Sequence, residues 1–194
     1  VWCAAKDGCL MAVIEAIATT YLEADAASVT FSGIPATYEH LQIRWNARSN
    51  STSWHGDYLF MQMGSGSVDT TSNYAYHNVR GYGTSKSVTK DASHTGILFD
   101  MVVSGGGSSG PPAPAYGGGV IDLLDYANTN KLTTISDVGG NPFAASTSYQ
   151  GVCFGSGLWM TATAVDTILM STAYDGTRGF ARGSEFTLYG LNSA

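Results

Sequence analysis

The sequence has 194 residues, of which only 12% are charged, and its 15 acidic and 9 basic side chains give a formal net charge of −6. A typical soluble domain is about 25% charged, so this surface must be largely neutral and polar. The net negative charge argues against a nucleic-acid partner. A membrane-spanning helix needs about 20 consecutive apolar residues, and no apolar run in the sequence is nearly that long. We therefore expect neither nucleic acid nor membrane among the partners of this chain.

The first ten residues differ from those that follow. Val1–Leu10 contain two of the three cysteines, and a patterned segment begins at Met11. We expect an N-terminal arm or extension over residues 1–10 and a single domain over residues 11–194. Cys153 stands in the apolar run Val152–Phe154 and is predicted to be a buried small hydrophobe, so that Cys3, Cys9 and Cys153 are all expected to be free thiols.

From Val13 onward, short apolar segments alternate with turn signals. The clearest segment is Leu41–Ala47, in which apolar and polar residues alternate as in a half-buried strand. Ser32–Pro35 predicts a corner, and Glu23–Ala27 has the composition of a single helical turn. Further strands are predicted at Val13–Ala18, Val29–Phe31, Tyr58–Met63, Tyr74–Val79, Gly96–Val103, Gln150–Phe154, Val165–Met170 and Glu185–Leu191. About ten short strands with glycine-rich turns predict an all-β fold, an antiparallel and jelly-roll-like β-sandwich.

The stretch Gly119–Ile135 admits two interpretations. Val120–Tyr126 is apolar on both faces of an extended chain, Ala127–Lys131 favours a chain reversal, and Leu132–Ile135 can return as a second strand. Alternatively, the spacing of the apolar residues from Val120 to Leu132 fits one amphipathic helix. Three preceding glycines and the run Asn128–Asn130 compete with a helix, which favours the pair of strands.

Two motifs typical of enzymes lie in the Gly/Ser/Pro segment 104–119, which we interpret as a long surface loop within the domain. Gly105–Gly110 satisfies G-x-G-x-x-G, and Gly106–Gly110 satisfies G-x-S-x-G. Both motifs need a helix to follow at once, whereas Pro111–Pro114 removes amide donors and favours extended backbone. The sequence therefore predicts no enzyme, no catalytic residues and no cofactor.

The histidines and the central aspartates do not form a recognisable metal site. His40, His55, His77 and His94 are far apart and none is paired with another at ligand spacing, although folding could still assemble a site from them. Asp122 and Asp125 would face opposite sides of a strand, so we predict that they hydrogen-bond within the adjacent turn. No metal is expected.

Two clusters place aromatic rings beside polar groups, which suits stacking on sugars if the rings are exposed and cross-strand packing if they are buried. The candidate glycan contacts are Trp54, His55, Tyr58, Tyr74, Tyr76 and His77. They support an alternative function, a carbohydrate-binding or host-receptor-binding module that recognises surface glycans.

Several segments resemble a group of small virion proteins of tailed bacteriophages, common in marine and cyanobacterial phages. The resemblance runs in the same order from Met11 to Leu191, and its most specific parts are the turn DYANTNK and the ending FTLYG. The other segments that carry it are Met11–Glu15, Val29–Tyr38, Leu41–Arg44, Asn73–His77 and Gly157–Trp159.

The resemblance implies a non-enzymatic structural component of the virion, a capsid decoration or fibre protein or a tail accessory protein. It further implies a jelly-roll-like sandwich that associates with copies of itself, for which we expect a homotrimer, and with other virion proteins of capsid or tail. It implies no catalytic residue. The low charge agrees with this function, because neutral surfaces can be buried against partners with little desolvation of charge.

Overall fold

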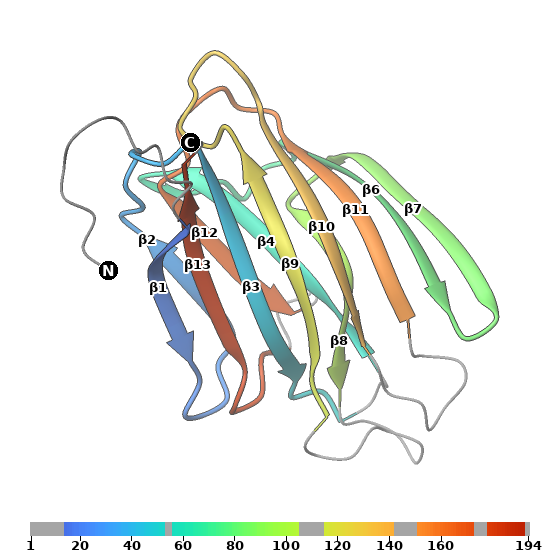
Figure 1. The fold of residues 1–194 in the computed structure, drawn as a ribbon. Coiled ribbons are helices and arrows are strands. Elements are labelled where there is room, and N and C mark those ends of the chain that lie inside the picture. Colours follow the sequence, from blue (N-terminus) through green and yellow to red (C-terminus); the bar gives the residue numbers. More distant parts are fainter. Residues whose placement is uncertain (1–13, 53–55, 105–114, 142–150, 173–177, 193–194) are drawn as a thin grey trace, which may run out of the picture.

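The computed structural model describes residues 14–52, 56–104, 115–141, 151–172 and 178–192, with the backbone alone for residues 100–104. These residues form thirteen strands and no helix (Figure 1). The strands are β1 (Ile14–Tyr21), β2 (Ser28–Ser32), β3 (His40–Ser49), β4 (Gly56–Ser65), β5 (Ser67–Val68), β6 (Tyr74–Tyr82), β7 (Ser85–His94), β8 (Ile97–Ser104), β9 (Gly117–Leu124), β10 (Thr133–Asn141), β11 (Gly151–Trp159), β12 (Thr167–Thr172) and β13 (Glu185–Leu191). No described residue belongs to a helix that could span a membrane.

The strands form two sheets packed face to face, which confirms the predicted all-β sandwich. Sheet A has eight strands in the order β1-β13-β3-β9-β10-β11-β6-β7. Sheet B has four strands in the order β2-β12-β4-β8, and the short β5 pairs with β4. Pairing is antiparallel except where the end of β3 meets β8 in parallel.

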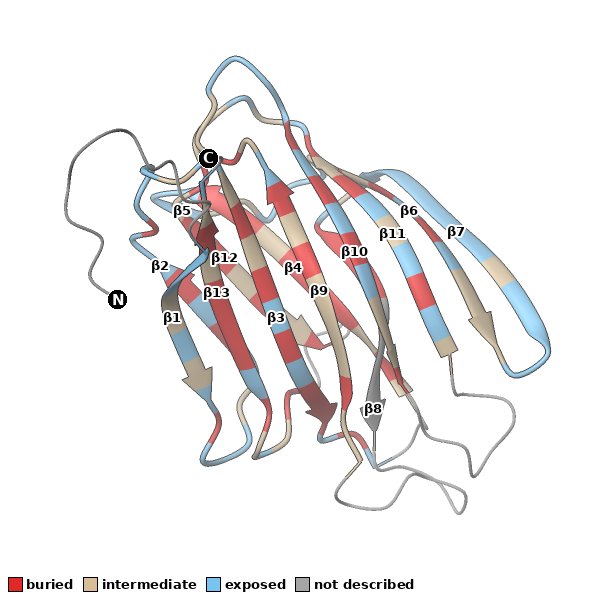
Figure 2. Ribbon diagram, viewed as in Figure 1, coloured by how far each residue is buried: buried red, intermediate tan, exposed pale blue. Residues whose placement is uncertain are grey.

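Alternation along the strands places the core between the sheets. In β3, Leu41, Ile43 and Trp45 are buried while the residues between them face outward. In sheet B, Met61 and Met63 of β4 are fully buried and belong to the same core. Figure 2 shows this alternation of buried and less buried residues along the central strands of sheet A.

The stretch Gly119–Ile135 forms two strands joined by a turn, so the helical alternative is wrong. β9 ends at Leu124, and Asp125 takes a left-handed conformation with φ of 53° at the start of the reversal. Within the turn, the backbone N–H of Asn130 donates to the side chain of Asn128, as short polar side chains in turns commonly allow. The predicted corner at Ser32–Pro35 is also present, with Gly33 at φ of 66°.

Two elements differ from the expectations. Glu23–Ala27 forms no helical turn, because Ala26 pairs in a β-bridge with Phe180 and so keeps this segment extended. β7 was not predicted at all, because nearly all of its residues are exposed on both faces and it has no apolar period. This strand forms the free edge of sheet A and lies to one side of the strands of sheet B (Figures 1 and 2).

Several predicted features lie outside the described residues: the arm 1–10 with Cys3 and Cys9, the side chains of Trp54 and His55, and most of the loop 104–119. Cys153 is described and buried, as predicted, and it is a free thiol.

Candidate functional site

A cavity of about 210 Å³ opens between the two sheets near the free edge of sheet A. Its volume suits a small group such as part of one sugar ring. The residues that line it come from β4, β6, β7, β8 and β11: Tyr58, Tyr76, Asn78, Arg80, Thr89, Leu98, Phe99 and Cys153.

Arg80 supplies the positive charge of this cavity. Its guanidinium carbon lies 5.3 Å from the ring centroid of Tyr58 and 5.6 Å from that of Tyr82, within cation–π distance. Its Nη1 also donates a 2.9 Å hydrogen bond to the hydroxyl of Tyr58. The cavity wall therefore combines aromatic faces with a fixed cation, a combination that can hold a polar ligand with an apolar face.

Asn78 supplies a buried amide beside the cavity, with 8% of its surface exposed. Its Nδ2 donates to the backbone carbonyl of Leu98, which orients Oδ1 toward Gly155 of the adjacent strand. Asp137 also directs Oδ1 toward Gly155, from the strand on its other side. The absent side chain of Gly155 thus leaves room for two oxygen acceptors that face each other.

The structure brings together only part of the predicted glycan-contact set. Tyr58 is half-buried and lines the cavity. Tyr76 also borders the cavity, but it is buried, with 7% of its surface exposed, and packs edge-on against His94, while Tyr74 is fully buried. Burial of these two tyrosines favours cross-strand packing over sugar stacking for this cluster. His77 is exposed on the opposite, outer face of sheet A. Asn78, Arg80 and Cys153 line the cavity and were not predicted, because their position depends on strand pairings that no short motif specifies.

Tyr74, at the start of β6, and Asp69 form a structural cluster outside the lining of the cavity. The hydroxyl of Tyr74 accepts from the backbone N–H of Met63 at 3.0 Å and lies 2.8 Å from the carbonyl oxygens of Met63 and of Asp69. Burial raises the pKa of Tyr74. These contacts give Tyr74 a role in packing rather than in binding.

Asp69 accepts four hydrogen bonds, from the backbone and hydroxyl of Thr71, the amide of Asn73 and the indole of Trp159. Desolvation alone would raise the pKa of Asp69, but these hydrogen bonds outweigh it and lower the pKa to about 2. The carboxylate therefore stays ionised and joins the segment after β5 to the end of β11.

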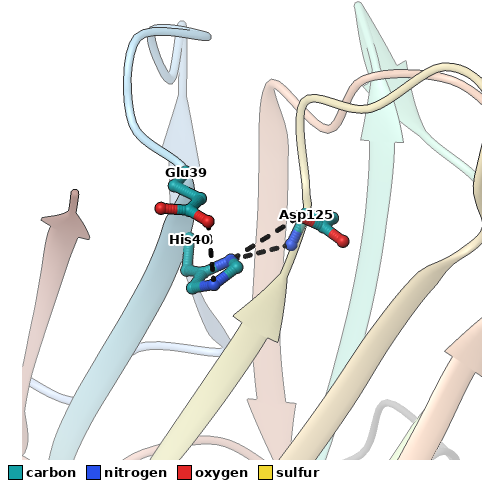
Figure 3. A group of neighbouring side chains, drawn as sticks. All are labelled: Glu39, His40 and Asp125. Carbon is teal, nitrogen blue, oxygen red and sulfur yellow. Dashed lines mark hydrogen bonds and ion pairs between the residues drawn. The ribbon is translucent and has the colours of Figure 1, made fainter. Parts of the chain in front are cut away.

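Folding brings one histidine next to two acidic residues. The pairing of His40 with Leu124 across β3 and β9 places its ring beside Asp125, and Glu39 precedes it in the chain (Figure 3). The Nε2 of His40 lies 3.8 Å from Glu39 Oε1, and its Nδ1 lies 4.0 Å from Asp125 Oδ1. No short motif indicates this cluster, since it depends on the register of β3 and β9.

Two of the possible ligand atoms of this cluster are already engaged. The backbone N–H of Asp125 donates to Nδ1 of His40 at 3.0 Å, so that nitrogen has no free lone pair for a metal. Lys131 Nζ lies 2.6 Å from the Asp125 carboxylate, and its hydrogen bond and its charge, aided by His40, lower the pKa of Asp125. These contacts close the β9–β10 turn, as predicted for Asp125.

The outer face of sheet A carries an exposed row of apolar side chains. The strand registers align Val120, Val138, Phe154, Val79 and Val88 across β9, β10, β11, β6 and β7, and we call these five residues the apolar row. Phe154 is 59% exposed and Val88 is 63% exposed. Beside this row, Gly118 and Gly140 form the floor of a shallow depression that is bordered by Val152.

The outer face is polar on its other side. Gln42 donates to Asp122 at 2.8 Å and accepts from Arg44 at 3.0 Å. The side chain of Asp122 thus bonds across to β3, and the prediction that it bonds within the adjacent turn is wrong. The guanidinium of Arg44 in turn lies 5.1 Å from the ring of Tyr189. The apolar row is thus confined to the half of the face made by β9, β10, β11, β6 and β7.

Comparisons with protein families, with curated proteins and with solved structures found no match to this chain.

Proposed function

We propose that this protein is a non-enzymatic structural component of a tailed-phage virion, a capsid decoration or fibre protein or a tail accessory protein. It acts by associating with copies of itself and with other virion proteins of capsid or tail. A homotrimer stays our prediction for the number of copies.

The apolar row is the observation that carries this proposal. Scattered apolar residues are normal on a protein surface, but five in register across five strands make a continuous patch of the kind that marks interaction sites. Charged residues next to it, Lys86, Lys90 and Asp122, lie in the rows on either side, so the apolar row itself can be buried without desolvating a charge. The resemblance that spans Met11–Leu191 points to the virion as the setting.

Localisation on purified particles tests the proposal. Antibody raised against the isolated protein and labelled with gold should decorate virions at regular positions, and the protein should appear in their mass-spectrometric profile. Absence of the protein from particles that retain their head and tail proteins would reject the proposal.

A second function, binding of host surface glycans, is supported by the cavity beside Arg80. Its aromatic and cationic lining is of the type that holds a sugar against a ring face. A glycan array should then show binding that is lost in Tyr58→Ala and kept in Tyr21→Ala, since Tyr21 is an exposed tyrosine on β1. Equal binding by both variants, or none by the wild-type protein, would remove this function.

A further inference from the structure

The apolar row is symmetric about the strand β11. Phe154 of β11 lies at its centre, Val138 and Val79 follow on the two neighbouring strands, and Val120 and Val88 follow on the next two. A rotation by 180° about an axis along β11 would therefore superpose valine on valine. The apolar row can therefore meet its own copy with valine against valine and Phe154 against Phe154.

The neighbouring rows extend the same symmetry. On one side of the apolar row, Val152 of β11 lies between Gly140 and Gly81. Glycine on both sides of Val152 leaves space beside it, and a Cβ at Gly81 would meet no atom within 4 Å. Val152 of β11 thus projects between two glycines, whereas Phe154 projects between two smaller valine side chains.

The charges at the two ends of the face are complementary under the same rotation. On the other side of the apolar row, Ser156 of β11 is the central residue of a row that ends in Asp122 on β9 and Lys90 on β7. Both end residues are two strands from β11. The rotation therefore places each Asp122 opposite the Lys90 of the other copy.

We propose that a second copy of this chain docks on this face, sheet against sheet, about a two-fold axis that runs along β11. Phe154 meets its own counterpart at the centre, and Val138 packs against Val79 of the other copy. Two Asp122–Lys90 pairs close the rim. This contact deepens the proposed function in assembly and rests on it. Being two-fold, it joins copies in pairs and is a different contact from the one that would build the expected homotrimer.

The size of the face predicts a weak contact. Five strands at about 4.8 Å spacing and three rows at about 6.8 Å spacing give roughly 500 Å² per copy. The resulting total of about 1,000 Å² lies below the standard size of stable interfaces and within the range of weak, transient contacts. On a particle, neighbouring copies would raise the effective concentration and make such a contact sufficient.

Sedimentation equilibrium of the purified protein, from about 10 µM to about 1 mM, tests the contact. We expect Phe154→Ser to weaken self-association at least about tenfold, because the central apolar side chain dominates a small interface. Tyr21→Ser removes an aromatic ring of similar exposure on β1 of the same sheet and should leave self-association unchanged. A wild-type chain that stays monomeric over this range, or a mass that Phe154→Ser does not change, would overturn the proposal.

A charge exchange tests the orientation of the two copies. Lys90→Asp alone should weaken association about tenfold, because each copy would then face Asp122 with a like charge. Combining Lys90→Asp with Asp122→Lys should restore association to within about threefold of the wild-type value. Failure of the double variant to recover, with circular dichroism showing a folded sheet, would reject the two-fold arrangement. These measurements use the isolated protein, so they remain distinct from the search for the protein on virions.

Discussion

Asp69 illustrates how a single side chain stabilises the region where β5, β6 and β11 meet. Its carboxylate accepts from three residues, Thr71, Asn73 and Trp159, and the last of these is ninety residues away along the chain. A carboxylate that accepts several hydrogen bonds favours its charged form, which is why the pKa of Asp69 falls to about 2. The folded state is therefore stabilised by ionisation of this group.

Asp69→Asn should lower the free energy of unfolding at pH 7 by about 1–2 kcal/mol, because an amide nitrogen would replace one accepting oxygen. The pKa of Asp69 in the folded protein lies below the ordinary aspartate value of 3.8, so the stabilisation is complete above about pH 4 and is lost as the pH falls toward 2. Urea unfolding of both proteins at pH 7 and near pH 2 measures this. An equal difference at the two pH values would contradict the role of the charge.

At the scale of elements, the three adjacent strands β10, β11 and β6 depend on a missing side chain. Gly155 lies between Asp137 and Asn78, and a Cβ there would collide with Oδ1 of both residues. Gly155→Ala should therefore destabilise the protein by about 2–4 kcal/mol. Gly81→Ala on β6 is the matched control: it places a methyl group in open space and should change stability by less than about 0.5 kcal/mol. Thermal unfolding distinguishes the two, and similar losses would refute the explanation.

The edge strand β7 carries two lysines, Lys86 and Lys90, at positions that face the outside of the sheet. Lysines on an exposed edge discourage pairing with a strand of another molecule. Replacing both by threonine, which favours strands, should increase aggregation on storage at high concentration, as followed by thioflavin fluorescence and turbidity. Lys131→Thr, in the β9–β10 turn, also removes one positive charge and should leave aggregation unchanged. If this variant aggregates as much as the double variant, the change in net charge, and not the loss of lysines from the edge strand, is the cause.

Alternation of apolar and polar residues predicted the strands that have one buried face, and β1 was predicted from its apolar residues although none of them is buried. The sequence analysis did not predict β5 and β7, which also have no buried residue. Leu41, Ile43 and Trp45 alternate with polar residues because only one face of β3 meets the core. β7 shows no such alternation, since sheet B does not cover it. A strand that is stabilised by its neighbour β6 rather than by burial of its own side chains leaves no periodic signal in the chain.

The cavity beside Arg80 was predictable only in part, because its lining depends on which strands are neighbours in the sheets. Tyr58 and Tyr76 were predicted as contacts because aromatic residues beside polar ones are visible in the sequence, and both line the cavity. The partners of these tyrosines, and the apolar row, depend on which strands are neighbours. β11 pairs with β6, about seventy residues earlier in the chain, and nothing local to Phe154 or Val79 indicates that pairing.

At the scale of the whole molecule, the two sheets are of unequal width. Sheet A has eight strands against four in sheet B, so the edge strand β7 lacks the cover that protects the inner faces of β3 and β9. The apolar row lies on the outer face of sheet A, which sheet B does not cover, so it is exposed whatever the width of sheet B. The core and the surface proposed for association are therefore opposite faces of the same sheet.

The position of β13 within sheet A sets a condition on the order of synthesis. β13 lies between β1 and β3, and it pairs with both along nearly its full length. The ribosome makes β1 first and β13 last among these strands, so β1 must wait for its only described partner until almost the whole chain has emerged.

A nascent chain stopped before Glu185 should therefore leave β1 without its partner and one edge of β3 open. We expect ribosome-bound chains of this length to be cleaved rapidly by added protease in the β1 segment and to bind trigger factor, whereas chains extended well beyond Leu191 should resist cleavage. Equal resistance at both lengths would mean that β1 finds its place before β13 is made.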